Sequence, residues 1–516
     1  MTNRDLDAAW KYHDGTKHSY LSVRTSAHAL DWENRPLLFK IYPTLEVMRL
    51  PKEVQQTGVA ALSAIASAGI APKENAVPDL ETLAQLLYLS AGVTKSRKYP
   101  GGEMFFRAAA CTGALYEIEL YIVSGDLPGL SAGVYHFGVA EFGLRQLRSG
   151  DYRQVLVEAT GSDQAVAQAP AIVVCTGTYW RNAWKYRSRT YRHFGWDNGT
   201  ILANLLAVSI ALGLPAKVVC GFVDQQVNAL LDLDTQREVA FSIVPLGRNP
   251  SPPAPRAPHI APLNLPLVPY SRTEVDYPAM RQMHEASSLI SPEEVASWRG
   301  SALPRHVSPA RTATATATVP APLDDSQIPR DPIEQVILRR GSTRRFVREP
   351  IGLAQLSTML ERATQGIPAD FLEPLAMQLN DLYLIVNQVD GLVPGAYFYH
   401  REQGSLECLK PGEFRSQAAY LGLEQELPGD ASVDVFFLAD LKPILDHFGN
   451  RGYRAAQLEA GMIGGKLYLS AYAQHLGATG LTFYDDDVVQ FFSPHAKGKS
   501  AIFLVALGVS ALRGAR

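Results

Sequence analysis

The sequence has few cysteines, little net charge and no long uninterrupted apolar run. Its four cysteines among 516 residues stand far apart and form no CxxC zinc or redox motif; they are Cys111, Cys175, Cys220 and Cys408. Such sparse usage argues against a disulfide framework and fits a reducing cytoplasm. The 48 Lys and Arg nearly balance the 51 Asp and Glu, for a net charge of −3. This balance predicts no nucleic-acid partner, because phosphate-backbone binding needs a basic surface.

The most apolar stretch, residues 201–219, is interrupted by Asn204, Ser209, Pro215 and Lys217. We therefore expect a buried helix followed by a strand there, and no membrane partner. The first residues, MTNRDLDAAWKYHDG, contain no apolar core that would predict a signal peptide. With 47% hydrophobic residues the chain can build sizeable cores, and its length predicts two to four domains. We expect a soluble cytoplasmic protein.

Proline is abundant in one region. Eight prolines stand between residues 250 and 269, and a second Pro-rich run covers residues 301–332. Proline restricts φ and removes a backbone donor, so these runs predict neither helix nor sheet interiors. The charged piece between them, 271–299, contains SPEEVASW, which has a helix N-cap pattern at Ser291 with Pro at the first helical position. We predict a linker over 249–330, extended across the surface or partly disordered.

The two halves that flank this linker repeat each other. ELYIV at 119 matches DLYLI at 381, GLSAGVY at 129 matches GLVPGAY at 391, RTYR at 189 matches RGYR at 451, and IVPLG at 243 matches LVALG at 504. These matches keep a spacing of 261 or 262 residues, which indicates a duplicated domain. We predict an N-terminal extension over 1–50 and two domains over 51–248 and 331–516.

Each copy has an α/β pattern. Amphipathic helices are expected over 80–92 and 353–365, and strands over the alternating segments ELYIV and DLYLIV and the apolar segments 171–176 and 433–438. Long core helices are expected over 199–212 and 460–476. Their Gly and Ala content favours close helix packing between the copies, although ordinary core packing explains most of their residues. The predicted fold class is α+β, an α/β sandwich, with the two copies paired.

Three clusters carry possible chemistry. Arg339, Arg340, Arg344 and Arg345 surround Gly341 and Ser342, a pattern that suits a phosphate or another discrete anion and is expected to enter the first helix of the second copy. A solvated basic loop is the alternative.

The second cluster, residues 184–193, is too aromatic for a solvated face and too basic for a core. Lys185 beside Tyr186 provides two proton-transfer groups, and proximity with partial burial would lower either pKa toward neutrality. A basic aromatic loop packed against carboxylates is the alternative. The corresponding residues of the second copy are His447 and Phe448.

The third cluster, RAAACTGALY at 107–116, is a turn of small residues that would let a flat ligand approach the backbone. The second copy is about eleven residues shorter here and has no equivalent loop.

Together these motifs resemble the flavin-dependent nitroreductase-like superfamily, specifically its SagB/McbC-type thiazole/oxazole dehydrogenases. The resemblance is carried by YHDGTKHSYLSVR (12–24), LDWENRPLLFKIYP (30–43), RAAACTGALYEIELYIV (107–123), WKYRSRTYR (184–192) and RRGSTRRF (339–346). It covers both halves but not the Pro-rich linker. The family's flavin-side loop normally has Pro-Ser where this chain has Ala110 and Cys111.

The resemblance implies FMN bound between two subunits, here fused as an intrachain pseudo-dimer. The first half lacks an arginine motif before residue 80, and the second half lacks the 107–117 loop. We therefore expect one composite FMN site, with an empty mirror-image site formed by 189–228 and 366–381. The expected FMN-binding residues are Arg340, Ser342, Arg344, Cys111, Thr112, Gly113, Ala114, Gly480 and Leu481.

The chemistry that the resemblance implies is oxidation of a peptide azoline to an azole, on a peptide or carrier-bound substrate and with a cyclodehydratase as a candidate partner. Lys185 and Tyr186 match the family's catalytic pair; which of the two is the base stays open. Arg187, Arg189 and Arg192 are expected to lower the lysine pKa. No metal is expected. Two alternatives remain: another flavin reaction, in which NAD(P)H reduces nitro compounds, quinones or dehydroamino acids, and a flavin-free scaffold that binds a peptide or cyclodehydratase.

Overall fold

The computed structural model describes residues 2–67, 75–99, 102–249, 256, 258–300, 317–324, 326–373 and 377–511. The first copy forms a six-stranded antiparallel sheet in the order β1-β6-β5-β4-β7-β8. Its strands are β1 Met48–Arg49, β4 Ile118–Ser124, β5 Gly133–Gly138, β6 Gly143–Ser149, β7 Ala171–Thr178 and β8 Glu238–Leu246. A separate hairpin, β2 Val93–Tyr99 and β3 Gly102–Arg107, leads into the 107–117 loop.

The second copy repeats this sheet in the order β10-β18-β16-β12-β14-β15-β9, with β17 paired to β18. Its strands are β9 Ala317–Thr318, β10 Phe346–Val347, β12 Asn380–Val386, β14 Gly395–His400, β15 Ser405–Pro411, β16 Val433–Ala439, β17 Gly477–Leu481 and β18 Ser500–Ser510. Two short strands, β11 Ile351–Gly352 and β13 Val389–Asp390, form a parallel pair. Five strands start 262 residues after their counterparts, as β12 does after β4. The duplication and the α+β class are confirmed.

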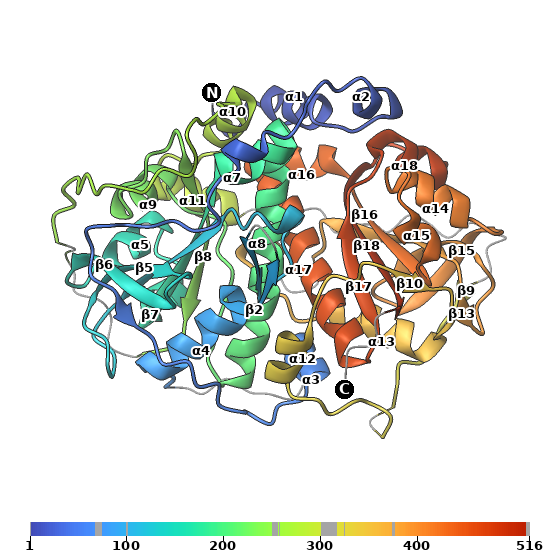
Figure 1. Cartoon of the computed structure of the whole chain (residues 1–516), viewed down its shortest axis with the longest axis horizontal. Helices are drawn as coiled ribbons and strands as arrows, with labels where there is room; N and C mark the ends of the chain where they lie inside the picture. Colours follow the sequence, from blue (N-terminus) through green and yellow to red (C-terminus); the bar gives the residue numbers. More distant parts are fainter. Residues whose placement is uncertain are drawn as a thin grey trace.

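Two long helices lie side by side between the two sheets (Figure 1): α8 Thr190–Ala211 from the first copy and α17 Arg451–Ala473 from the second. Gly199 lies against Gly461 so closely that a Cβ atom on either residue would collide with the backbone of the other helix. The close packing predicted from the small residues is therefore present. Both helices begin about nine residues before the predicted starts, because the polar residues of their first turns are helical and buried.

Those first turns hold the copies together through reciprocal ion pairs. Arg189 and Arg192 bind Asp485 of the second copy at 3.0 and 2.7 Å. In return, Arg451 and Arg454 bind Asp224 of the first copy at 2.6 and 2.7 Å. Such a two-fold pattern is that of an isologous dimer interface. The statement that residues 184–193 are too basic for a core is wrong, because Arg189 and Arg192 are buried with a carboxylate partner.

The N-terminal segment and part of the Pro-rich region make matching contacts on this interface. Helix α1 Asp7–Gly15 and helix α10 Pro278–Ala286 lie next to each other at one end of α8 and α17 (Figure 1). His13 is 3.3 Å from the Tyr453 hydroxyl, and His284 is 3.3 Å from the Tyr191 hydroxyl. Helix α11 Pro292–Gly300 starts at the predicted proline. Residues 271–300 are thus packed structure and not extended linker, whereas residues 301–316 lie outside the described residues.

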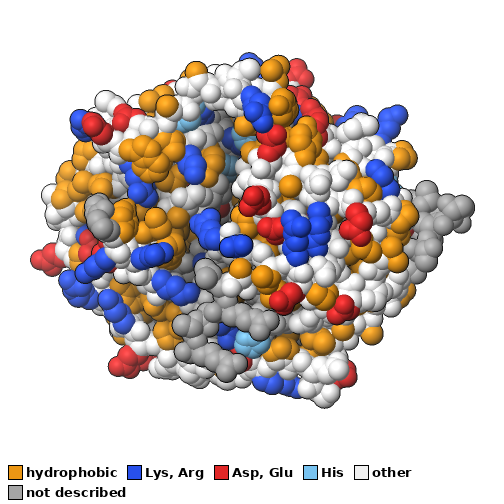
Figure 2. All heavy atoms as spheres, turned by 45° about the vertical axis from the view of Figure 1, so that its right-hand side comes forward, with side chains coloured by type: hydrophobic (Ala, Val, Ile, Leu, Met, Phe, Trp, Pro, Cys, Tyr) orange, Lys and Arg blue, Asp and Glu red, His pale blue; other side chains and the backbone are white. Residues whose placement is uncertain are grey.

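The remaining helices cover the sheets and connect the strands (Figure 1). They are α2 Tyr20–Arg24, α3 Ala61–Ala66, α4 Leu80–Ala91, α5 Arg153–Ala159, α6 Gln164–Gln168, α7 Tyr179–Tyr186, α9 Asp224–Leu230, α12 Ile333–Arg339, α13 Leu353–Thr364, α14 Arg415–Leu421, α15 Glu426–Asp430, α16 Leu441–Phe448 and α18 Asp485–Phe492. Short 3₁₀ turns are η1 Trp32–Asn34, η2 Thr112–Ala114, η3 Arg187–Arg189 and η4 Asp370–Leu372. Among the described residues, none of the helices has the length and apolar character needed to cross a membrane. The face in Figure 2 mixes basic, acidic and apolar side chains and has a hollow in its upper part.

Candidate functional site

The 107–117 loop has an unusual backbone that its neighbours hold in place. Gly113, Ala114 and Tyr116 have φ values of 63°, 53° and 54°, a region that non-glycine residues rarely adopt. Asp197 of α8 fixes the loop by accepting hydrogen bonds from the Thr112 backbone N–H and hydroxyl, at 2.9 Å each. A carboxylate that binds the turn in this way offsets part of its strain, so the loop presents a defined surface.

Cys111 lies beneath this surface in a buried polar cluster. Its thiol donates to Asp197 at 3.2 Å and to Glu117 at 3.4 Å, and its sulfur accepts from the Tyr116 backbone N–H at 3.0 Å. Burial, followed by the charges of Asp197 and Glu117, raises the pKa of the Cys111 thiol well above its usual value. The thiol therefore stays protonated and acts as a hydrogen-bond donor, not as a nucleophile. Ligand atoms of Cys111, Glu117 and Asp197 lie within 4.8 Å of one another, but they are already joined by these hydrogen bonds.

Lys185 and Tyr186 are the last residues of α7; Tyr186 lies beside this loop, and Lys185 is exposed next to it. The Lys185 ammonium is 5.2 Å from the centroid of the Tyr186 ring. A Cβ atom on Gly113 would lie 2.9 Å from the Tyr186 hydroxyl oxygen, so glycine leaves the space that the tyrosine uses. The structure thus places Tyr186 against the small-residue loop and Lys185 beside the Tyr186 ring.

The pKa shifts of this pair differ from the expectation in two respects. Burial, and then the charge of Arg344, lowers the pKa of Lys185 below 10.5, whereas the expected neighbours Arg189 and Arg192 bind Asp485 instead. Burial, and then the charge of Asp197, raises the pKa of Tyr186 above its usual 10. The expected lowering of the tyrosine pKa is wrong, because burial disfavours the charged phenolate and Asp197 adds to this effect. At neutral pH Tyr186 is a protonated hydrogen-bond donor.

Arg340 connects the second copy to the loop of the first. Its guanidinium donates to the carbonyl oxygens of Ala108 at 2.8 Å and Arg107 at 2.9 Å. The residue is 8% exposed, and no carboxylate of the described chain lies within ion-pair distance of it. A buried guanidinium without a counter-charge is costly, so this position favours an anion. The arginine turn follows the end of α12 and does not enter a helix as expected.

The other residues of the turn differ in their surroundings. Arg339 binds Asp331 at 2.7 Å and therefore has a structural partner. Arg344 is exposed and lies near enough to Lys185 to lower its pKa. Arg345 is exposed. Of the four arginines, Arg340 and Arg344 are the two that combine with the first copy's loop and lysine.

Tyr468 of α17 joins two predicted segments of the second copy. Its hydroxyl oxygen is 3.4 Å from the Ser342 hydroxyl and accepts a hydrogen bond from the Gly480 backbone N–H. Gly480 and Leu481 end β17, where both are partly exposed. The predicted segments 340–344, 480–481, 107–117 and 185–186 therefore surround one region between the copies. Sequence reasoning missed Tyr468, which lies in a helix that it treated as core, and Asp197, which lies two residues before the predicted start of the other long helix.

The donor set of this region fits a phosphorylated flat cofactor such as FMN. It offers guanidinium groups without carboxylate partners among the described residues, a serine hydroxyl and a glycine-containing loop with no bulky side chain at its centre. The Thr482 hydroxyl, directly after Leu481, is buried and has no hydrogen-bond partner within the described chain. A ligand with acceptor groups would satisfy these donors.

Several groups of the mirror-image region already have partners in the described chain. Asp370 of the shortened loop accepts hydrogen bonds from the backbone N–H groups of Cys220 and Gly221, at 2.9 and 2.8 Å. Trp298 of α11 is buried, packs at a tilt against Phe448 with ring centroids 5.1 Å apart and donates to the Phe448 carbonyl. Phe448 is the counterpart of Tyr186.

Comparison with known proteins gives the same two-domain division. The Nitroreductase family model matches residues 73–248 and again 337–508. Two curated relatives are the trifolitoxin-processing protein TfxB of Rhizobium leguminosarum, 30% identical over 30% of this chain, and the microcin B17-processing protein McbC of Escherichia coli, 30% identical over 29%. The matched segments span 43% and 52% of those relatives. The crystal structure of a candidate nitroreductase from Anabaena variabilis aligns over 98% of this chain and 99% of its own, with a TM-score of 0.76 and 26% identity.

Proposed function

Because the chain belongs to the nitroreductase family, with one family domain in each half, we propose that it is an FMN-dependent dehydrogenase of peptides. Its reaction is oxidation of a thiazoline or oxazoline ring to the azole, or a closely related peptide dehydrogenation. Two relatives are named as processing proteins of peptide products, which supports a peptide substrate. A cyclodehydratase, which would form the azoline ring, is the expected partner in the pathway.

One observation carries the proposal: Tyr186 lies beside the loop to which Arg340 of the other copy is bonded, and Lys185, whose pKa is lowered, lies beside the Tyr186 ring. Arg340 and Arg344 would hold the FMN phosphate, with Ser342 as a neutral donor. The 111–114 turn and Gly480–Leu481 would lie against the ring. A generic hydride relay needs no carbon-acid base, so the retained Lys185 favours dehydrogenation.

Lys185 is the base in this proposal. Azoline oxidation removes a proton from the ring Cα and a hydride from the adjacent ring carbon, and a double bond forms between them. Neutral Lys185 accepts the proton, and its lowered pKa increases the neutral fraction at a given pH. Tyr186, which keeps its proton, donates a hydrogen bond that orients the peptide. Bound FMN would accept the hydride and pass the two electrons to oxygen.

The direct test uses purified protein supplied with FMN and a peptide that carries one thiazoline. We expect flavin absorbance to remain with the protein after gel filtration, and the peptide to lose two hydrogens by mass spectrometry while oxygen is consumed. Rapid NAD(P)H consumption with a quinone, without azoline oxidation, would instead identify a reductase. Failure to retain flavin would contradict both redox functions and favour the flavin-free scaffold that binds a peptide or cyclodehydratase.

We expect one FMN per chain. In the mirror-image region Asp370 already accepts from the N–H groups of Cys220 and Gly221, and Trp298 packs against Phe448, which disfavours a second flavin there. Released flavin, quantified by absorbance against protein concentration from amino-acid analysis, should approach a ratio of one. A ratio of two would contradict the composite site.

A further inference from the structure

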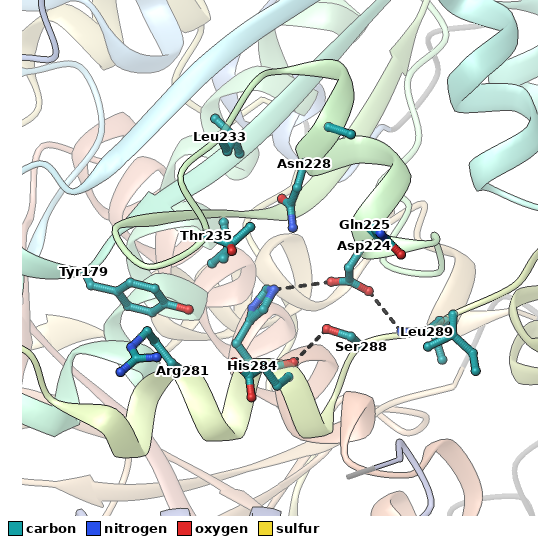
Figure 3. Close-up of a pocket in the computed structure, with 14 residues that line it drawn as sticks. Tyr179, Asp224, Gln225, Asn228, Leu233, Thr235, Arg281, His284, Ser288 and Leu289 are labelled. Carbon is teal, nitrogen blue, oxygen red and sulfur yellow. Dashed lines mark hydrogen bonds and ion pairs between the residues drawn. The ribbon is translucent and has the colours of Figure 1, made fainter. Parts of the chain in front are cut away.

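A cavity of about 390 Å³ lies beside α9 and α10, away from the candidate FMN site (Figure 3). Charges of both signs line it, because Arg281 and Glu285 belong to its wall together with neutral polar and apolar side chains. It therefore selects no class of ligand by charge. The hairpin of β2 and β3, which adjoins the candidate site, differs because its exposed charges are mostly of one sign.

This hairpin belongs to neither of the two large sheets. In the described part of the chain its strands pair with each other alone, and residues 95–99 and 102–104 are exposed. The second copy is shorter at this point, and its described residues form no such hairpin. A two-stranded hairpin adds little stability by itself. Its presence in the copy that carries Lys185 and Tyr186 therefore favours a role in function.

One face of the hairpin adjoins the arginine turn of the second copy. The Lys95 ammonium donates to the carbonyl oxygens of Arg339 at 3.0 Å and Arg340 at 3.1 Å. Arg97 lies on the same face as Lys95, because the side chains of a strand alternate between its two faces. The strand β3 leads directly into the 107–117 loop. This face therefore borders the candidate FMN site.

The exposed charges of the hairpin are unbalanced. Its exposed cations are Lys95, Arg97 and Lys98. The exposed carboxylate of Glu103 is paired in register with Lys98 and therefore lies on the face opposite to Arg97. Among the described residues, neither Arg97 nor Lys98 forms an ion pair. Since other arginines are proposed to hold the FMN phosphate, these cations are available to a different anion.

Apolar side chains share the face that carries Lys95 and Arg97. Met104, which is 38% exposed, lies opposite Arg97, and the partly exposed Phe106 lies opposite Lys95. Tyr99, two residues after Arg97, adds a ring that is 44% exposed. A phosphate group would use the cations alone. An acidic peptide fits better, because its carboxylates can pair with the cations while its apolar groups pack against these side chains.

We infer that this face of the hairpin binds an acidic segment of the peptide substrate, close to the ring that reacts. The inference rests on the proposed function for the identity of the substrate. Arg97 pairs with a carboxylate of that segment. Lys95 keeps one donor for a second carboxylate, because an ammonium group has three donors and the two carbonyl oxygens use the others. Exposed ion pairs are weak, so the hairpin contributes to substrate selection and not to the chemical step.

The test is fluorescence anisotropy on the FMN-loaded full chain with two labelled, end-capped peptides of the same sequence, except that one has Glu where the other has Gln. At low ionic strength we expect the Glu peptide to bind about three- to ten-fold more tightly. The preference should disappear in Arg97→Glu and be intermediate in Arg97→Gln. The control is Lys497→Glu, which reverses an exposed cation after α18 of the second copy and should keep the preference.

Equal binding of the two peptides, or a preference for the Glu peptide that survives in Arg97→Glu, would overturn the inference. Stronger displacement of the Glu peptide by NADPH than by the unlabelled Glu peptide would also overturn it, because the cations would then belong to a nucleotide site. Flavin absorbance and azoline oxidation, recorded on the same samples, test the proposed function separately. An Arg97-dependent preference without azoline oxidation would contradict the proposed reaction alone.

Discussion

Replacing Arg340 with alanine is expected to raise the dissociation constant for FMN by about 10- to 100-fold or more, because a charge-assisted hydrogen bond to a phosphate contributes about 1.5–3 kcal/mol. The guanidinium is buried, bonds only the carbonyls of Arg107 and Ala108, and has no carboxylate partner in the described part of the chain. The alanine variant loses both the cation and the donors. Fluorescence titration of the apoprotein with FMN measures the change.

The matched control is Arg345→Ala, which removes an exposed cation five residues along the same turn. We expect its FMN affinity to stay within about two-fold of the wild type, since screened surface charges contribute little. Arg340→Lys should give an intermediate dissociation constant for FMN, because lysine keeps the positive charge but lacks the planar guanidinium group that can donate two parallel hydrogen bonds. Arg340 also connects the two copies, so thermal unfolding of each apoprotein must accompany the titration. Unchanged FMN affinity in a folded Arg340→Ala variant would show that Arg340 does not bind the FMN phosphate.

The sequence carried enough information to predict the duplicated architecture. Segments such as ELYIV at 119–123 and its counterpart at 381 alternate or cluster apolar residues in the way that buried strands require, and β4 and β12 cover both. The spacing between such segments stays constant while the two copies diverge in sequence, because each copy must form the same sheet. The small residues Gly199 and Gly461 likewise marked the close contact of α8 with α17.

Long-range partners could not be predicted in the same way. Arg189 and Arg192 look too polar for a core until Asp485, almost 300 residues later, is known to neutralise them. The same limit explains the wrong direction for the Tyr186 pKa. Its basic neighbours Arg189 and Arg192 bind Asp485, while burial, and then the charge of Asp197 on the next helix, raises the Tyr186 pKa. Spatial neighbours decide electrostatics, and adjacency in the chain does not reveal them.

The site residues that the sequence predicted are those that belong to distinctive local patterns. The arginine turn, the Lys-Tyr pair and the small-residue loop each stand out in a short window. Tyr468 and Asp197 do not, because a single polar side chain in a long helix is compatible with many surroundings. Their roles, in holding Ser342 with Gly480 and in fixing Thr112, appear only when the helices are packed.

Lys185→Met is expected to lower azoline oxidation by about 10²- to 10⁴-fold, the usual contribution of a general base, with the FMN dissociation constant unchanged. Methionine keeps much of the volume of the exposed side chain and removes only the amine. Tyr186→Phe retains the ring beside Gly113 and removes the donor, so it should have a smaller effect, mainly on the KM for the peptide. Turnover is measured by mass spectrometry of the peptide at saturating FMN. A Lys185→Met variant with wild-type turnover would exclude Lys185 as the base.

The pH dependence provides a second test of the lysine that does not require its removal. The active form is the neutral amine, so kcat/KM should rise as pH increases through the lowered Lys185 pKa and then level off. Arg344 contributes to that lowering by repelling the protonated amine, and Arg344→Gln removes the repulsion. The pKa of Lys185 should therefore rise, and the ascending limb should move to higher pH, when FMN is saturating. A limb that stays in place, or moves to lower pH, would show that another group controls the proton transfer.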